Sequence, residues 1–269
     1  MTTSWWRYLQ PRRSLPHHQH PGTGTLARSD DVFWAEFLGI DPDAWNEAGI
    51  SYRAHVGLSG YRGFWCFRRN DRVVVSAPSS WLGLLEVKFA GWSQDRMLSC
   101  AALAEALGAA CERSIGPAFQ GCLEPSRFVP RAEPQLCKLA PAHANVVDRF
   151  RRECGIEAWD TSGLALAELW RYAYFQGEQI TAMAGYRRWR GHAGGPCVLT
   201  HPDFRGQGHG TAAVAAVVAE ALANQELLLY QTLESNQAAV RLALALGYER
   251  YGNHVAVRLK WDAPEPCST

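Results

Sequence analysis

The order of strand and helix patterns along this sequence predicts an α/β protein built on a mixed sheet. Hydrophobic residues make up 47% of its 269 residues and charged residues 20%, a composition typical of globular chains. In the second half, runs with strand character alternate with runs whose apolar residues recur at helical spacing. A glycine-rich turn also joins one of these strands directly to an apolar helix. A chain of this length forms one large domain or two modest ones.

The charge balance and the lack of long apolar runs exclude several classes of protein. The 27 basic and 26 acidic residues give a formal charge of +1, whereas nucleic-acid-binding proteins of the basic type carry a strong positive excess. The first residues lack the apolar core of a secretory signal, and no run reaches the roughly 18 apolar residues of a membrane span. We therefore expect a cytoplasmic protein with no nucleic-acid partner and no membrane partner.

The cysteine and histidine patterns predict no metal site. The eight cysteines form neither a CxxC pair nor a closely spaced set, unlike zinc ligands or disulfide scaffolds; they stand at positions 66, 100, 111, 122, 137, 154, 197 and 267. This distribution is typical of buried, reduced thiols. Three histidines, His17, His18 and His20, cluster near the N-terminus, and we interpret that cluster as incidental and not as a metal site.

The first half carries few residues that indicate chemistry. Residues 1–29 are rich in Pro, Gly, Arg and His, which predicts a flexible tail. The α/β domain that follows, 30–133, shows patterns for a hairpin, a further strand and a helix: 62–69 with 72–77 around Asn70-Asp71, then 84–89, then 93–113. Gly116, Pro117 and the proline-containing stretch 124–134 mark the expected boundary with the second domain.

The second domain, 134–269, has a more regular order of one helix, three strands, a helix, a strand, a helix and a strand. The segments with these patterns are 141–153, 164–175, 179–189, 197–200, 211–223, 227–232, 236–246 and 254–260. Gly247 follows the last helix, as expected of a residue that ends a helix.

The most informative segment is the glycine-rich turn in residues 198–211, VLTHPDFRGQGHGT. Its three glycines, Gly206, Gly208 and Gly210, let backbone amides gather at the start of a helix, where unpaired amides and the helix dipole favour a phosphate. Arg205 at the rim adds a charged donor. The spacing excludes a mononucleotide P-loop, which needs a Gly-Lys pair, and it departs from the GxGxxG of Rossmann folds.

The spacing RxxGxG resembles the pyrophosphate-binding turn of the GNAT superfamily of acyl-CoA-dependent N-acyltransferases. A second segment, from Asn236 through Ala239 to Gly247 and Tyr248, is similar to the NxxAxxL segment of that family. It follows the turn at the family's distance, after one helix and one strand. The resemblance covers about residues 135–262 and implies a GNAT-like fold in the C-terminal half.

The resemblance also implies a set of acetyl-CoA ligands. The strand before the turn would bind pantetheine through its main chain, the turn would bind the pyrophosphate, and the second segment would border the pantetheine arm. These roles fall on Val198, Leu199 and Thr200, on Arg205, Gly206, Gln207, Gly208, His209, Gly210 and Thr211, and on Asn236 and Ala239. In the family the segment after the first helix lines the acceptor site, so Glu157 and Asp160 are the expected substrate-binding residues.

The general acid cannot be transferred from the family, because the sequence departs from its pattern. Ala243 stands where the family usually carries a tyrosine, seven residues after the asparagine. A leaving thiolate still needs a proton, so we assign the acid to Tyr248, with Tyr251 and Tyr230 as alternatives.

The general base departs from the family pattern too. The strand that leads into the turn carries no Asp or Glu. We therefore expect Glu168, acting through water, to be the base, with Glu157, Asp160, His192 and His201 as alternatives. Arg187, Arg188 and Arg190 form a local basic cluster, which we interpret as a solvated hairpin.

Together these features predict an N-acetyltransferase that moves an acetyl group from acetyl-CoA to a primary amine of a small molecule or peptide. The amine would attack the thioester directly, and no metal would take part. The alternative is a coenzyme A-binding regulatory or interaction module that has lost turnover, which Ala243 favours. The N-terminal domain is either a degenerate repeat of the same fold or an unrelated substrate-binding or dimerising domain, so a homodimer is compatible with the sequence.

Overall fold

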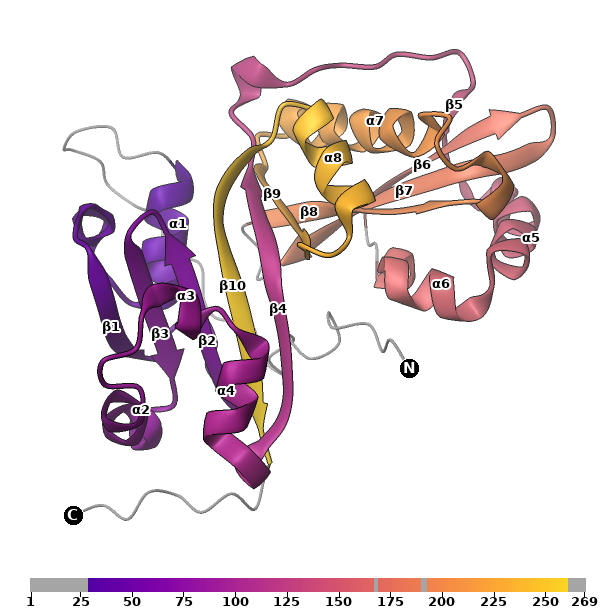
Figure 1. The fold of residues 1–269 in the computed structure, drawn as a ribbon. Coiled ribbons are helices and arrows are strands. Elements are labelled where there is room, and N and C mark those ends of the chain that lie inside the picture. Colours follow the sequence, from indigo (N-terminus) through magenta and orange to yellow (C-terminus); the bar gives the residue numbers. More distant parts are fainter. Residues whose placement is uncertain (1–28, 167–168, 190–192, 261–269) are drawn as a thin grey trace. The chain divides into compact units, whose positions relative to one another are not determined.

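The computed structural model describes residues 29–166, 169–189 and 193–260 (Figure 1). Apart from Ser29, the tail expected over 1–29 therefore lies outside the described residues. The described chain forms two compact units. The C-terminal unit comprises Gly121–Gln231 and Gln237–Glu249, and the N-terminal unit comprises 29–120, Thr232–Asn236 and 250–260.

The C-terminal unit contains a mixed sheet with the strand order β9-β8-β7-β6-β5. Its strands are β5 (Leu136–Lys138), β6 (Leu169–Gln176), β7 (Gln179–Trp189), β8 (Ala193–Thr200) and β9 (Leu227–Leu233). The neighbours from β5 to β8 run antiparallel, whereas β9 runs parallel to β8. The strand expected from residue 164 begins at Leu169, because Leu164–Leu166 forms a 3-10 turn.

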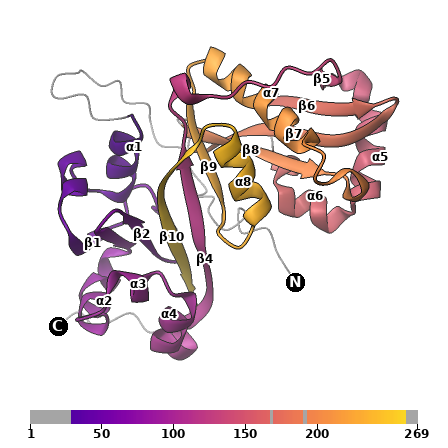
Figure 2. The same ribbon diagram turned by 45° about the horizontal axis from the view of Figure 1, so that its top comes forward.

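Helices cover both faces of this sheet, as Figures 1 and 2 show from two directions. They are α5 (Ala144–Cys154), α6 (Ile156–Ser162), α7 (His209–Ala223) and α8 (Gln237–Ala245). On one face, Phe150 and Trp159 from α5 and α6 share a core with Met183 of β7. On the other face, α7 packs against β6, β7 and β8, and Ala182 of β7 contacts Ala212 of α7. Because successive side chains of a strand point to opposite faces, β7 serves both cores.

The N-terminal unit contains sheet strands in the order β1-β3-β2-β10-β4. Its strands are β1 (Gly49–Ala54), β2 (Gly63–Arg69), β3 (Arg72–Ala77), β4 (Cys111–Cys122) and β10 (Glu249–Leu259). The expected hairpin is confirmed, since β2 and β3 pair antiparallel across Asn70-Asp71 and Asn70 has φ +49°. Strand β1 pairs parallel with β3, so this sheet is mixed too.

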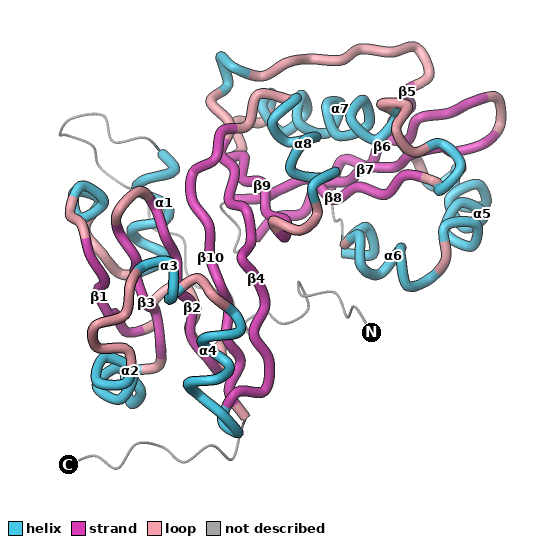
Figure 3. Tube along the Cα trace, viewed as in Figure 1, coloured by secondary structure: helices cyan, strands magenta, loops and turns pink. Residues whose placement is uncertain are grey.

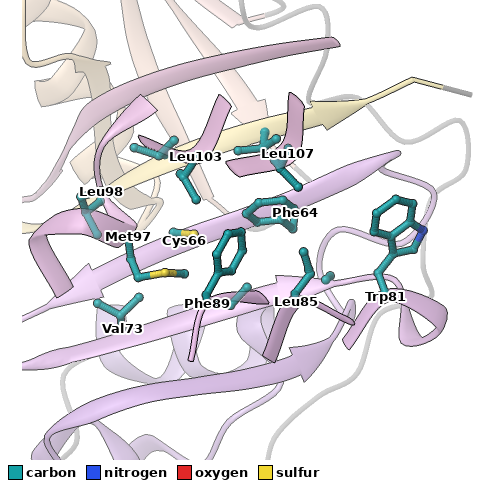
Figure 4. Packing of buried hydrophobic residues seen from close by; sticks show 14 of the residues in the cluster. Phe64, Cys66, Val73, Trp81, Leu85, Phe89, Met97, Leu98, Leu103 and Leu107 are labelled. Atoms are coloured by element: carbon teal, nitrogen blue, oxygen red, sulfur yellow. The ribbon is translucent and has the colours of Figure 1, made fainter. Parts of the chain in front are cut away.

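The helices of the N-terminal unit enclose its core. They are α1 (Ser29–Leu38), α2 (Leu82–Lys88), α3 (Gln94–Met97) and α4 (Cys100–Leu107). Figure 4 shows how Phe64 and Cys66 of β2 pack against Leu85, Phe89 and other apolar residues that follow β3. The alternate residues of β2 bury their rings on the opposite face, where Trp34 of α1 lies 4.5 Å from Phe67 between ring centroids.

Two expected elements of the first half are wrong. The strand expected over 84–89 is the helix α2 (Figure 3), because its buried Leu85 and the buried Phe89 at its C-terminal cap lie four positions apart. The helix expected over 93–113 is broken into α3 and α4 and stops at Gly108, which has φ +54°. The expected boundary at Gly116 and Pro117 lies inside β4.

The compact units do not follow the expected boundary after residue 133. Strand β10, from the end of the chain, pairs antiparallel with β2, with Val255 opposite Cys66. The N-terminal unit therefore contains a strand that the sequence placed in the second domain. None of the described helices has the length and apolar character that crossing a bilayer requires.

Candidate functional site

Strands β8 and β9 pair only at their first residues and then separate. The ladder joins Ala193 to Leu227 and Gly194 to Leu228. The next residue of β8 whose backbone faces β9 is Pro196, and a proline has no N–H to donate to a neighbouring strand. The sequence therefore ends the ladder locally, and an opening forms between the two strands.

The alternation of the β7–β8 ladder decides which backbone groups face this opening. The His201 amide donates to the Thr181 carbonyl oxygen at 2.9 Å, in register with the ladder. Pairing alternates along an antiparallel ladder, so Leu199 also bonds towards β7. Val198 and Thr200 direct their N–H and C=O groups to the other edge, from which β9 has departed. That edge can accept an extended ligand as an added strand.

Helix α7 begins at the mouth of the opening. A Cβ on Gly210 would lie 2.6 Å from Thr200 Oγ1, so the first turn of the helix lies against the end of β8. The Ala212 amide bonds to the Gly208 carbonyl oxygen at 3.0 Å, whereas the amides of residues 209–211 meet no backbone acceptor in the described part of the chain. These three amides and the helix dipole favour an anion at this point.

The glycines before α7 have the backbone that the sequence predicted. Gly206 has φ +78° and Gly208 has φ +85°, a region that favours glycine. A Cβ on either residue would meet nothing within 4 Å, so the space beside both is open. Gln207 is exposed, and its amide donates to the Asp203 carbonyl oxygen at 3.4 Å, which braces the turn.

Arg205 and His209 lie on different sides of this turn. Burial and the Glu153 carboxylate raise the pKa of the Cys154 thiol to about 11, and the charge of the exposed Arg205 opposes this shift, so Arg205 lies near the end of α5. The His209 ring instead stacks on Tyr174 of β6, with centroids 4.1 Å apart. His209 therefore holds α7 on the sheet through its side chain, and only its backbone amide faces the anion position.

A pocket lies between β8 and β9 at the closed end of the opening. It is lined by Arg187, Gly194, Gly195, Pro196, Cys197, Leu229 and Gln231. A Cβ on Gly195 would lie 2.7 Å from the Leu229 carbonyl oxygen, so the strands approach this closely because the residue has no side chain. The pocket starts where the ladder ends and continues towards the edge formed by Val198 and Thr200.

Cys197 is the thiol of this pocket. Burial raises the pKa of its thiol, and the positive charges of Arg187 and Arg171 oppose that shift. A thiol that stays protonated is a weak nucleophile. The raised pKa therefore makes Cys197 a poor candidate for a covalent enzyme intermediate.

Three buried tyrosines, Tyr186, Tyr230 and Tyr248, lie close to one another. The Tyr248 hydroxyl has no hydrogen-bond partner in the described structure, although Tyr248 is only 2% exposed. Its ring meets the Tyr230 ring edge-on, with centroids 5.2 Å apart. Burial, followed by the neighbouring Tyr230 and Tyr186, raises the pKa of Tyr248 well above its usual value. Tyr248 therefore keeps its proton, as a general acid must before it acts.

Tyr248 also lies close to the position that lacks the family's tyrosine. Its amide donates to the Ala243 carbonyl oxygen at 3.1 Å, so it follows directly on the end of α8. The alternative Tyr251 belongs to the N-terminal unit, where its hydroxyl accepts a hydrogen bond from Arg69 at 3.0 Å. Tyr230 belongs to β9, where its ring lies on the strand face opposite to Leu229 and Gln231, which line the pocket.

The expected base and substrate-binding residues divide between the described and undescribed parts of the chain. Glu168 and His192 lie outside the described residues. Glu157 and Asp160 both lie on α6, Glu157 exposed and Asp160 half-buried. His201 is buried at the far end of β8, where its Nδ1 accepts the Asp203 amide at 3.3 Å. Six residues of strand, about 20 Å, separate it from Gly195 in the pocket, too far for a base.

Asn236 and Ala239 lie at the start of α8, as the second motif predicts. Asn236 is exposed and immediately precedes the helix. Its amide donates to the Leu233 carbonyl oxygen at 2.9 Å, which ends the turn after β9. Ala239 lies in the first turn and is half-buried.

The sequence interpretation missed the burial of Arg187. Arg187 is only 7% exposed and lines the pocket, so the solvated hairpin does not include Arg187. Arg188 points to the other face and pairs with Glu226, with Nε 2.9 Å from Oε1, whereas Arg190 lies outside the described residues. The signal was available, since Arg187 shares a strand face with the buried Met183.

The residues of the opening fit coenzyme A. Two unpaired strand positions can bond to an amide-containing arm, the free amides of α7 can bind phosphate oxygens, and open space lies beside Gly206 and Gly208. The described residues contain no group of three or more His, Cys, Asp or Glu side chains that could hold a metal ion. The tail histidines His17, His18 and His20 lie outside them.

Comparison with known families agrees with this geometry. Residues 144–248 match the model of the acetyltransferase (GNAT) family, which is less than half of the chain. The match confirms the resemblance found in the C-terminal half. The segment holds α5 to α8 and β6 to β9, including the opening and the turn before α7.

A search of solved structures also found proteins described as acetyltransferases of the GNAT family. A GNAT-family protein from Novosphingobium aromaticivorans is 20% identical (TM-score 0.45) and aligns over 55% of this chain and 65% of its own. An acetyltransferase from Colwellia psychrerythraea is 11% identical (TM-score 0.46; 59% and 61%). A GCN5-related N-acetyltransferase from Kribbella flavida is 19% identical (TM-score 0.45; 58% and 62%). The chain thus spans less than two thirds of each. A comparison with curated proteins found no match.

Proposed function

We propose that this protein is an N-acetyltransferase that moves an acetyl group from acetyl-CoA to a primary amine of a small molecule or peptide. The observation that carries the proposal is the opening between β8 and β9, with the free amides of α7 at its mouth and a pocket at its closed end. The GNAT family match over the same residues supports an acyltransferase. The acetyl group, the amine and the role of each residue are part of the proposal.

The proposed ligand contacts follow the length of the opening. Val198 and Thr200 would bond to the pantetheine arm through their backbone groups. The turn from Arg205 to Gly208 and the amides of residues 209–211 would hold the pyrophosphate. Leu199, Asn236 and Ala239 would border the arm. This order directs the reactive end of the arm into the pocket at Cys197, where the acceptor nitrogen meets it.

The chemistry needs one proton removed and one supplied. The neutral amine forms the new C–N bond at the thioester carbonyl, the C–S bond breaks, and the amine proton leaves through a base. We assign that base to Glu168, acting through water, and the donor for the thiolate to Tyr248. Glu157 and Asp160 on α6 are proposed to hold the substrate ammonium before it loses its proton.

A coenzyme A-binding module without turnover is the second candidate. Ala243 favours it, because the usual proton donor is absent and position 243 is fully buried. The two candidates differ in thiol release: an enzyme releases free coenzyme A when acetyl-CoA and a suitable amine are mixed, whereas a binding module does not.

We expect Gly208→Ala to weaken acetyl-CoA binding about tenfold or more, equivalent to roughly 1.4 kcal/mol. The new Cβ would project into the open space beside Gly208 where the pyrophosphate is placed. Isothermal titration calorimetry of wild type and variant measures this change.

The matched control is Gly177→Ala, in the turn between β6 and β7. Gly177 also has a positive φ, +60°, and a Cβ there also meets nothing within 4 Å, so both variants carry a similar backbone penalty of about 1 kcal/mol. Gly177→Ala should bind acetyl-CoA like wild type. Equal binding in all three proteins would remove the phosphate assignment, and no binding to wild type at millimolar acetyl-CoA would remove the proposed function.

We expect Cys197→Ala to keep the wild-type mechanism. Because its thiol stays protonated and the transfer is direct, the variant should release coenzyme A at a rate within about threefold of wild type. Rapid-mix mass spectrometry should find no acetylated enzyme. Loss of turnover together with an acetyl group on wild-type Cys197 would show a covalent route instead.

The remaining assignments of the chain stay proposals. We propose that the C-terminal unit, Gly121–Gln231 with Gln237–Glu249, is the acetyltransferase domain predicted over 134–269, acting in the cytoplasm without a nucleic-acid or membrane partner, alone or as a homodimer. The N-terminal domain as a degenerate repeat stays a prediction, because the family match begins at residue 144.

A further inference from the structure

Gln231 of β9 carries a buried hydrogen-bond donor that the described structure does not use. Its Nε2 is buried and has no hydrogen-bond partner among the described residues. Gln231 also lines the pocket at the closed end of the opening. Buried polar groups are normally paired, so a buried amide N–H without an acceptor indicates that a ligand supplies one. The proposed function places the reactive end of the coenzyme arm in this same pocket.

The register of β8 and β9 places Gln231 across the opening from Cys197. Their ladder ends with Gly194 opposite Leu228. Continued for three more residues, the same register brings Gln231 level with Cys197, and both residues line the pocket. The unpaired amide therefore lies beside the space that opens where the two strands separate.

Pro196 removes the donor that β8 itself would offer near this level. The backbone groups of Val198 and Thr200 point to the open edge of β8, and the next position in the same direction is Pro196. An arm that adds to β8 as a strand would meet N–H donors at the first two positions and then a proline, which has none. A carbonyl oxygen at the end of the arm would therefore need a donor from another element, and Gln231 on β9 has one unpaired.

The other side chains of the pocket suit this role less well. Arg187 takes part in interactions of its own within the protein. The Cys197 thiol is protonated, but an S–H group is a weak donor. The remaining lining residues have no polar side chain: Gly194, Gly195, Pro196 and Leu229. A neutral amide N–H also favours an acceptor such as a carbonyl oxygen over an ammonium group, which is itself a donor.

We propose that Gln231 is a catalytic residue whose Nε2 donates a hydrogen bond to the carbonyl oxygen of the acetyl thioester. This inference rests on the proposed function, which supplies the thioester. When the amine nitrogen forms the C–N bond, the π electron pair of the carbonyl moves to its oxygen. That pair returns when the C–S bond breaks and its electrons leave with the sulfur, while the amine proton passes to the base. A donor at this oxygen stabilises the negative charge that develops in between.

Two ligands that differ only at this carbonyl test the proposal by binding, without an acceptor amine. Calorimetry compares acetyl-CoA with S-ethyl-CoA, in which a methylene group replaces the carbonyl. We expect wild type to bind acetyl-CoA about tenfold more tightly, because the thioether leaves the Gln231 N–H unpaired. Gln231→Met has a similar volume but no donor, so it should bind the two ligands within about twofold of each other.

A control variant and a spectroscopic readout assign this preference to Gln231. Gln176→Met makes the same change at an exposed residue of β6 and should keep the wild-type preference. The infrared carbonyl band of bound, isotope-labelled acetyl-CoA should lie at a higher wavenumber in Gln231→Met than in wild type, because a hydrogen bond weakens the C=O bond. If Gln231→Met does not fold, Gln231→Leu takes its place in both measurements.

The two possible failures are distinguishable. If wild type binds acetyl-CoA and S-ethyl-CoA equally, this inference is wrong and the proposed function stands. The same holds if Gln231→Met keeps the wild-type preference and the wild-type carbonyl band. If wild type binds neither ligand and no free coenzyme A, the proposed function fails and this inference falls with it.

Discussion

Tyr248→Phe is expected to lower turnover by on the order of 10² while the free energy of unfolding stays equal to wild type or rises. The Tyr248 hydroxyl is buried and has no partner among the described residues, so its removal breaks no hydrogen bond. Removing an unsatisfied buried hydroxyl is neutral or stabilising by about 1 kcal/mol. The Km for acetyl-CoA should not change, because the proposed coenzyme contacts lie mainly on β8 and α7. Thiol-release kinetics and urea unfolding measure the two effects.

Tyr186→Phe is the matched control, because it should show the opposite result. Tyr186 is also fully buried, but its hydroxyl donates to the Leu227 carbonyl oxygen at 3.5 Å. Removing that hydroxyl should cost about 1 kcal/mol of stability and leave turnover intact. If Tyr248→Phe behaves like Tyr186→Phe, losing stability and keeping turnover, Tyr248 is a structural residue. Tyr230 would then be the next candidate for the general acid.

The parts of the site that were predictable depend on local backbone chemistry. Alternate glycines before an apolar helix predicted the turn, and Gly206 and Gly208 do have positive φ. Gly247, with φ +96°, ends α8 as expected. Such features need only a few adjacent residues, because the conformations that glycine permits and a helix start requires are set within one turn of chain.

The parts that were not predictable depend on which strands meet. An alternating apolar pattern predicts a strand over 254–260, but it does not say that β10 pairs with β2 rather than with a strand of its own domain. Likewise, Pro196 explains why the β8–β9 ladder ends only once β9 is known to be the neighbour of β8. The charge of Arg187 suggested that its side chain is exposed to solvent. The structure shows that the strand face it shares with Met183 is buried.

Lowering the pH from 6.5 towards 3 is expected to destabilise the N-terminal unit through His254. The ring is 1% exposed and stacks on Trp65 with centroids 4.1 Å apart. Its Nδ1 accepts a hydrogen bond from Gln120 Nε2 at 2.5 Å, so a proton on Nδ1 would place two donors face to face. Burial lowers the pKa of His254 to about 3.

The sign and size follow from linkage. Above pH 6.5 the ring is neutral in the folded and in the unfolded state, and its full contribution to the free energy of unfolding is present. Between pH 6.5 and 3 the unfolded chain binds a proton that the folded ring does not, so the free energy of unfolding falls by up to about 1.4 kcal/mol per pH unit, roughly 4 kcal/mol in all. Urea unfolding at pH 7, 6 and 5 measures this slope.

A double variant isolates the contribution of His254. His254→Phe with Gln120→Met keeps the stack on Trp65 and replaces both hydrogen-bonding partners by apolar groups, so neither is left unpaired in the core. Its unfolding free energy should fall less steeply below pH 6.5, by the equivalent of one proton, while all other titrating groups cancel in the comparison. Parallel pH profiles for the two proteins would mean that the folded state takes up this proton too, which requires the Gln120–His254 pair to open before the sheet does.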